Sequence, residues 1–256
     1  MRSDTGQVFR LEDYRPSDYL IPLTHLDFDL SPEATLVTAE LTLERRAGVA
    51  DTTPLVLDGD GLELVSLAID GTPAKPGDFE ATPDLLTVKP PRARRFVLTI
   101  RTRMSPETNT QLMGLYRSNG VYCTQCEAEG FRRITYFLDR PDVLSVYSVR
   151  IEAPKKDAPL LLSNGNPGAH GDLGGERHYA EWNDPFPKPS YLFALVAGDL
   201  GSIKDHFVTQ SGRRVELGIY VEHGKESRAS YAMDALKRSM RWDEEKFGRE
   251  YDLDVF

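Results

Sequence analysis

The chain has 256 residues, of which 40% are hydrophobic and 28% charged, a composition typical of a folded globular protein with one or two domains. Its formal net charge of −9 repels phosphate backbones and anionic membrane surfaces, so we expect neither nucleic acid nor membrane as a partner. The two cysteines, Cys123 and Cys126, lie too close together in the sequence to cross-link distant loops through a disulfide, which excludes a secreted disulfide scaffold.

The N-terminus and the hydropathy of the chain bear on its location. Residues 1–8 contain no apolar stretch of the kind found in a signal peptide. Elsewhere no run approaches the roughly 18 consecutive apolar residues that a membrane-spanning helix needs. We therefore expect a soluble, cytoplasmic protein.

The first two-thirds of the chain are predicted to form short strands separated by turns. Apolar and polar residues alternate over residues 26–30 and again over 37–43, on either side of a turn at residues 31–33. This pattern is typical of a β-hairpin with one solvent-exposed face. Further apolar runs, most of them bounded by Gly, Pro, Asp or Asn, predict strands at residues 55–57, 62–69, 85–88, 96–101, 146–151 and 160–162. Many short strands without helical periodicity between them predict an antiparallel β-sandwich.

The pattern changes toward the C-terminal end. The nearly all-apolar run at residues 191–198 predicts a strand buried on both faces that closes the first domain. Another strand is predicted at residues 215–221. Beyond it a helix is predicted, with Gly248 as its C-cap, because apolar residues recur at helical spacing: Ala229, Met233, Leu236, Met240 and Phe247.

Two domains are therefore predicted. The first is a β-sandwich over residues 12–200, and the second begins within residues 201–256. The chain ends in an alternating stretch at residues 251–256 without a polar tail. We expect a truncated chain, and a short C-terminal edge strand is the alternative.

Residues suited to metal binding or redox chemistry are sparse. Zinc hydrolases commonly use two His four residues apart on a helix, and no two of the five histidines have this spacing. They are expected at the surface or core edge: His25, His170, His178, His206 and His223. Cys123 and Cys126 lack the strand-to-helix setting of a redox pair and the second C-x-x-C of a zinc ribbon, so two buried, inert side chains are favoured. No phosphate-binding, dinucleotide-binding or G-x-S-x-G motif occurs.

The most unusual segment covers residues 123–142, where carboxylates, an amide and aromatic rings lie in one non-periodic loop. By residue type alone, a solvated charged loop is favoured. Five blocks of the sequence, however, match a family pattern in order: C-T-Q-C-E-A-E-G-F-R, I-T-Y-F-L-D-R-P-D, L-L-S-N-G-N, W-N-D-P-F-P-K-P-S-Y-L-F-A-L-V-A-G-D and R-W-D-E-E-K-F-G-R-E-Y-D-L-D. Through these blocks the chain resembles, from about Tyr14 to Phe256, the bacterial aminopeptidase N family of gluzincin metallopeptidases.

The resemblance implies a mainly β fold, in which an N-terminal antiparallel β-sandwich is followed by the start of an α/β, thermolysin-like zinc domain. In that family a loop of the sandwich reaches the active site and holds the free α-amino group of the substrate. The residues that match it here are Gln125 and Glu127. Glu129, Asp139 and Arg140 also match the family pattern, and for them a structural role in anchoring the loop is expected.

The resemblance also implies a function that this chain does not complete. The family's G-x-M-E-N stretch, its H-E-x-x-H zinc helix with a downstream Glu and its oxyanion-stabilising Tyr would lie beyond Phe256. We therefore expect no catalytic residue and no bound metal in this chain, and no activity from it alone. Zinc is implied for the full-length enzyme, a zinc aminopeptidase that removes N-terminal residues from peptides.

The implied partners are peptide substrates with a free N-terminus and the remainder of the catalytic domain. A non-catalytic β-sandwich interaction module is the alternative function.

Overall fold

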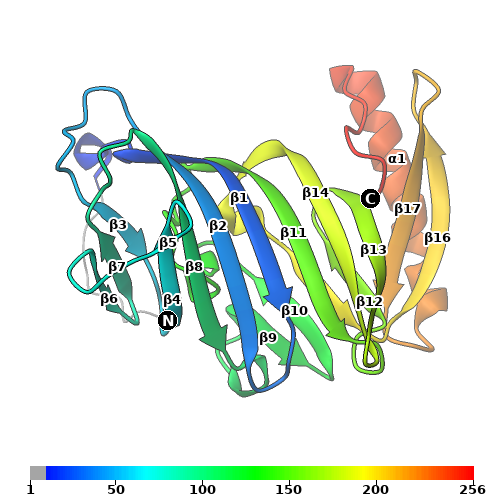
Figure 1. Ribbon diagram of the computed structural model, residues 1–256. Helices are drawn as coiled ribbons and strands as arrows, with labels where there is room; N and C mark the ends of the chain where they lie inside the picture. The colour runs from blue at the N-terminus through cyan, green and yellow to red at the C-terminus, as the bar shows by residue number, and fades with distance from the viewer. Residues whose placement is uncertain (1–9) are drawn as a thin grey trace.

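The computed structural model describes residues 10–256, so the segment at residues 1–8, where no signal peptide is predicted, lies outside the described residues. The fold is mainly β, as predicted (Figure 1). Within residues 10–256, no helix has both the length and the apolar character needed to cross a membrane. Short 3-10 helices lie outside the strands: η1 (Leu11–Asp13), η2 (Pro106–Thr108), η3 (Phe131–Arg133), η4 (Ser190–Leu192) and η5 (Glu226–Ala229).

An eight-stranded sheet forms one layer, with the strand order β13-β14-β11-β1-β2-β8-β4-β5. The predicted hairpin is confirmed: β1 (Tyr19–Asp29) pairs antiparallel with β2 (Thr35–Arg45), and buried side chains alternate with more exposed ones along both strands. The other strands of this sheet are β4 (Glu63–Ile69), β5 (Thr72–Pro73), β8 (Arg95–Met104), β11 (Leu144–Pro154), β13 (Asn166–Gly174) and β14 (Arg177–Pro189).

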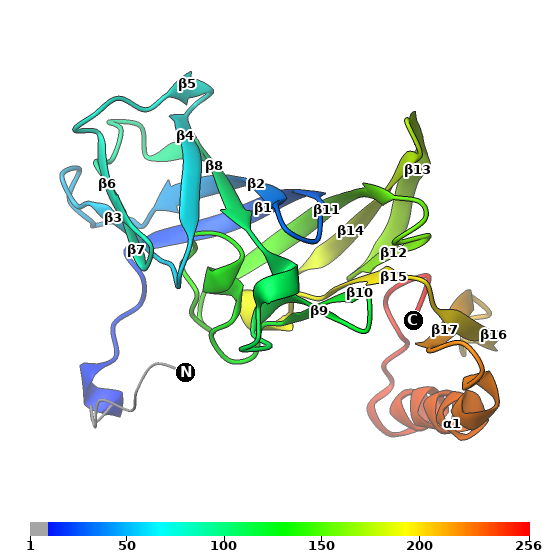
Figure 2. The same cartoon turned by 90° about the horizontal axis from the view of Figure 1, so that it is seen from below.

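A four-stranded sheet lies against one face of the large sheet (Figure 2). Its order is β12-β15-β10-β9, and its strands are β9 (Gly114–Ser118), β10 (Val121–Gln125), β12 (Leu160–Ser163) and β15 (Leu195–Gly198). A three-stranded sheet contains β3 (Leu55–Asp58), β6 (Phe79–Thr82) and β7 (Leu85–Val88). One hydrophobic cluster includes Leu26, Leu86 and Leu195, one residue from each sheet. The predicted β-sandwich is therefore confirmed.

One pairing in the sandwich is parallel. β1 lies between β2 and β11, and it pairs with β11 in parallel register, with Leu26 opposite Val149. The partner strand begins more than 110 residues after β1 ends, because the whole segment from β2 to η3 is inserted between them. Parallel strands need such a crossover, whereas neighbouring antiparallel strands need only a tight turn.

The prediction for residues 191–198 is wrong over its first half. Ser190–Leu192 form η4, and only Leu195–Gly198 form a strand. The turn places Phe193 in the core with 3% of its surface exposed, while Leu192 remains 49% exposed. An apolar run therefore does not guarantee a strand when one large ring in it is drawn into the core.

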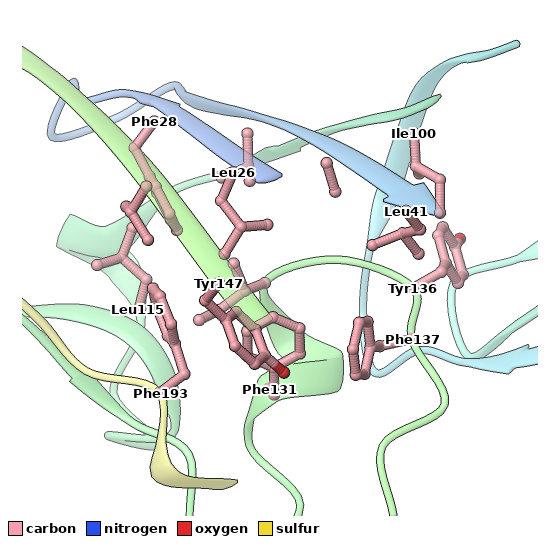
Figure 3. Close-up of a cluster of buried hydrophobic side chains, with 14 of the residues drawn as sticks. Leu26, Phe28, Leu41, Ile100, Leu115, Phe131, Tyr136, Phe137, Tyr147 and Phe193 are labelled. Carbon is pink, nitrogen blue, oxygen red and sulfur yellow. The ribbon is translucent and has the colours of Figure 1, made fainter. Parts of the chain in front are cut away.

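Five aromatic rings fill the space between the two larger sheets (Figure 3): Phe28, Phe131, Phe137, Tyr147 and Phe193. Phe131 lies at the centre, with ring centroids 4.8 Å from Phe137 and 5.4 Å from Phe193 in edge-to-face geometry. Phe28 stacks on Phe193 at 5.9 Å. Such pairs are attractive beyond the area they bury. This aromatic cluster joins strands of the large sheet to the segment that follows β10.

The C-terminal part has a separate, smaller hydrophobic cluster. The hairpin β16 (Gly201–Val208) and β17 (Arg214–Val221) packs on α1 (Ser230–Phe247) through Phe207, Leu217 and Met240, among others. Gly248 ends the helix in the left-handed conformation, at φ 62°, and donates its N–H to the carbonyl of Glu244 at 3.1 Å. The predicted C-cap is confirmed. Figure 1 shows these elements at the end of the molecule away from β3, β6 and β7.

We propose that the boundary between the two predicted domains lies near residue 200. The two hydrophobic clusters share no residue, and the contacts between the parts include polar ones, such as His223 Nε2 with Asp199 Oδ1 at 2.8 Å and Asn166 with Asp254. The face of α1 away from the hairpin carries exposed rings, with Tyr231 75% exposed.

This proposal predicts unequal stability along the chain. In native-state hydrogen exchange on this chain, the amides of α1 are expected to exchange at least about tenfold faster than those of β1 and β2, because the helix packs on a much smaller core. Exchange of both groups through one common global opening would contradict a boundary near residue 200.

Candidate functional site

The end of β10 carries the residues that the sequence singles out. Gln125 is the last residue of the strand and lies opposite Gly114 of β9. Gln125 and Glu127 are exposed, and Cys126 between them is buried in the core with 2% of its surface exposed. This alternation continues the pleat of the strand by two residues and gives Gln125 and Glu127 a common solvent-facing side.

Two glycines allow the chain to turn sharply after Glu127. The N–H of Gly130 donates to the carbonyl of Cys126 at 2.7 Å, which closes the turn. A Cβ at Gly130 would lie 2.3 Å from the carbonyl oxygen of Gln125, and a Cβ at Gly114 would lie 2.6 Å from the Cβ of Arg133. Both positions therefore require glycine. We refer to residues 125–130 as the loop 125–130.

The side chains of the loop 125–130 differ in their contacts. The amide nitrogen of Gln125 donates to the backbone carbonyl of Glu127 at 3.1 Å, which keeps the Gln125 side chain beside the turn. Within residues 10–256, the carboxylate of Glu127 forms no ion pair or hydrogen bond. An exposed carboxylate without a cationic neighbour is available to an incoming cation, and the amide next to it supplies a second polar group.

Glu129, Asp139 and Arg140 are found in contacts within the protein. Glu129 is an exposed residue whose carboxylate lies 3.3 Å from the guanidinium of Arg132. Asp139 is buried with 3% of its surface exposed and accepts hydrogen bonds from Arg132. Arg140 forms two 2.8 Å hydrogen bonds to the carboxylate of Asp142. These contacts agree with the structural role that we expect for the three residues.

Arg132 was not singled out from the sequence. Its side chain is 7% exposed and contacts three carboxylates, those of Asp58, Glu129 and Asp139. In a chain rich in charged residues, a single arginine forms no recognisable local pattern. Arg132 stands out only in the folded structure, because its partner Asp139 is buried.

Cys123 and Cys126 are free thiols. Cys123 is half-buried on β10, and Cys126 is part of the main hydrophobic cluster. Burial raises the pKa of both thiols, which disfavours the thiolate that redox or nucleophilic chemistry would use. Their surroundings are those of structural side chains.

Within residues 10–256, no group of three or more His, Cys, Asp or Glu side chains is arranged to hold a metal ion. Two of the histidines illustrate this: His178 contacts the carbonyl of Ala158 at 2.7 Å, and His25 contacts the hydroxyl of Ser148 at 2.7 Å.

Comparison with known proteins places this geometry in a family. The family model of the peptidase M1 N-terminal domain matches residues 15–192. Aminopeptidase N of Caulobacter vibrioides is 59% identical over 257 residues, which cover 100% of this chain and 29% of that protein. The chain thus spans less than a third of the length of this relative.

Two solved structures have the same fold. Legionella pneumophila aminopeptidase A, determined in complex with aspartic acid, superposes with a TM-score of 0.90 at 37% identity over 96% of this chain and 29% of its own. An M1 zinc metallopeptidase mutant from Deinococcus radiodurans, bound to a Tyr-Ser-Ala substrate, has a TM-score of 0.77 at 18% identity, over 93% of this chain and 56% of its own. The second shows the likeness of fold alone. The match of the family model and the Caulobacter relative show that the chain belongs to the M1 peptidase family.

Proposed function

We propose that this chain is the N-terminal part of a zinc aminopeptidase and that the loop 125–130 binds the free α-amino group of the peptide substrate. The observation that carries the proposal is the exposed carboxylate of Glu127, which has no cationic partner in residues 10–256 and lies next to Gln125. Membership of the M1 family and the names of the relatives supply the reaction class.

The chemistry of the ligand fits the loop. The α-amino group of a peptide, with a pKa near 8, is largely protonated at neutral pH. A carboxylate about 4 Å from that ammonium contributes roughly 4 kcal/mol of Coulomb attraction at an effective dielectric constant near 20, before desolvation is subtracted. An internal peptide bond presents no ammonium to this site. The loop thereby favours removal of N-terminal residues over cleavage within a chain.

On this proposal, substrate binding and zinc binding are carried by different parts of the full-length enzyme. The chain covers 29% of the Caulobacter relative, and on this proposal the remaining residues hold the zinc. Zinc, when bound, supplies an activated water and a Lewis acid for hydrolysis. The residues of this chain bind and orient the amine end of the substrate. A cytoplasmic location is part of the same proposal and rests on the sequence features described above.

Replacement of Glu127 by Gln is the direct test of the amine site. The assay uses a full-length enzyme in which this chain is joined to the remaining residues of the Caulobacter relative. Glu127→Gln keeps most of the side-chain shape and removes the charge, so kcat/KM on an aminoacyl anilide is expected to fall about 10- to 150-fold, with zinc content unchanged.

Glu129→Gln is the matched control, because it removes a second exposed carboxylate two residues away that already faces Arg132. Its kcat/KM is expected to stay within about twofold of the unmodified enzyme. If both variants hydrolyse the anilide like the unmodified enzyme, Glu127 is only a solvated loop carboxylate and the amine site is refuted.

The isolated chain is expected to be inactive. Gel-filtered chain is predicted to retain no stoichiometric zinc and to show no turnover of aminoacyl anilides, because residues 10–256 provide no set of ligands for the metal. Metal analysis and a turnover assay on the same fraction check this. Zinc that copurifies one-to-one with the chain, or activity that follows the protein peak, would overturn the proposed division of labour.

A further inference from the structure

A buried polar network lies directly behind the loop 125–130. The carboxylate of Asp139 accepts hydrogen bonds from the backbone N–H of Arg132 at 3.2 Å and from its Nε at 3.0 Å, both on Oδ2. Its other oxygen, Oδ1, accepts the hydroxyl of Ser190 at 2.5 Å. The Arg132 guanidinium also donates to the backbone carbonyl of Asp139 at 3.0 Å. All three residues are buried, with 6%, 3% and 1% exposure for Arg132, Asp139 and Ser190.

Arg132 and Asp139 hold the C-terminal end of the loop 125–130, where the chain leaves the loop. Arg132 follows Phe131 in η3, and the N–H of Arg133 donates to the carbonyl of Gly130 at 3.1 Å. Phe131 is fully buried in the aromatic cluster (Figure 3). The chain therefore leaves the loop at a point held both by an apolar ring and by an ion pair in the interior.

Ser190 belongs to the segment that fixes the entry of the loop. It starts η4, which leads through Phe193 into β15. β15 pairs with β10, and the N–H of Leu195 donates to the hydroxyl of Thr124 at 2.8 Å, one residue before Gln125. The hydrogen bond from Ser190 to Asp139 thus joins the segment beside the loop entry to the segment at the loop exit.

We propose that Asp139 and Ser190 are positioning residues for the amine site: the Ser190–Asp139 hydrogen bond sets the spacing of the two ends of the loop 125–130 and thereby the position of the Glu127 carboxylate. This inference rests on the proposed function of Glu127. It assigns a role in substrate recognition to Ser190, which lies 63 residues along the chain from Glu127 and touches no substrate. A charge-assisted contact depends steeply on distance and direction, so a small shift of the loop weakens amine binding selectively.

The alternative is that the network contributes only to stability. A purely stabilising contact lowers the population of folded protein without changing which ligands the folded protein prefers. The two roles therefore differ in ligand selectivity, and the mild substitution Ser190→Ala distinguishes them, because it removes one hydroxyl and leaves the Arg132–Asp139 pair in place. Ser163→Ala is the matched control, since Ser163 donates to the carbonyl of Ala194 at 2.8 Å from neighbouring β12 without contacting Asp139.

The first measurement uses this chain. In Ser190→Ala, hydrogen exchange at loop amides, including that of Gly130, is expected to be at least about tenfold faster, while exchange in β1 and β2 is unchanged. Ser163→Ala is expected to leave the loop amides unaffected. Unchanged loop exchange in Ser190→Ala would overturn the proposal at this stage, whatever the function of Glu127.

The second measurement uses the full-length enzyme and two probes that differ only in the α-amino group, L-leucine and 4-methylpentanoate. The inhibition constant of 4-methylpentanoate divided by that of L-leucine reports amine recognition. Ser190→Ala is expected to reduce this ratio about 3- to 30-fold, and Glu127→Gln to reduce it about 10- to 150-fold. In the double variant the ratio is expected to match that of Glu127→Gln alone, because Ser190 acts through the carboxylate.

The outcomes separate the two proposals. If Glu127→Gln leaves the ratio unchanged, the proposed amine site fails, and the positioning role fails with it. If Glu127→Gln lowers the ratio but Ser190→Ala does not, or if the two effects multiply in the double variant, the amine site stands and the positioning role is overturned.

Discussion

The burial of Phe131 is the constraint on which the site depends. Its ring is fully buried against Phe137, Tyr147 and Phe193, between the two larger sheets. Removal of such a ring typically costs about 3–5 kcal/mol, a large fraction of the stability of a domain. The chain between the end of β10 and Phe131 has only five residues in which to reach the surface and return. The glycine at position 130 and the exposed position of Glu127 follow from this short path.

The polar groups beneath the loop have a different physical role from the rings. A buried ion pair such as Arg132–Asp139 gains little net free energy over an apolar pair of the same size, because both charges lose their hydration. Its hydrogen bonds are directional, however, whereas apolar packing is not. The rings hold the segment in the core, and the carboxylate of Asp139 determines how the segment is oriented there. A binding loop needs both, since an ammonium ion is recognised over a narrow range of distances.

The strands with a clear alternation of buried and exposed residues, such as β1 and β2, were predicted from the sequence, whereas β13 was missed. The hairpin of β1 and β2 follows from the alternation of residues such as Leu26 and Phe28. β13 has Gly, Asp and Pro at most positions and little buried surface, so its residues carry no such pattern. The parallel pairing of β1 with β11 depends on contacts between residues more than 110 positions apart, which periodicity does not encode.

The role of the candidate site residues stays a prediction. Gln125 and Glu127 came from the resemblance to a family, and the structure shows both exposed, with Cys126 buried between them. Contacts between distant segments were not accessible: Ser190 lies just before the run at residues 191–198 that the sequence alone assigns to a strand, and nothing near it in the sequence points to Asp139. The resemblance thus identified the exposed residues of the loop, while the buried groups behind them became visible only in the folded chain.

The central claim, that the carboxylate of Glu127 receives the substrate amine, is tested most directly by a crystal structure of the full-length enzyme with L-leucine bound. The account predicts the α-amino nitrogen within about 3.2 Å of a carboxylate oxygen of Glu127, with Gln125 as a second contact. An amine held by other carboxylates, with Glu127 more than about 6 Å away and still in solvent, would contradict it.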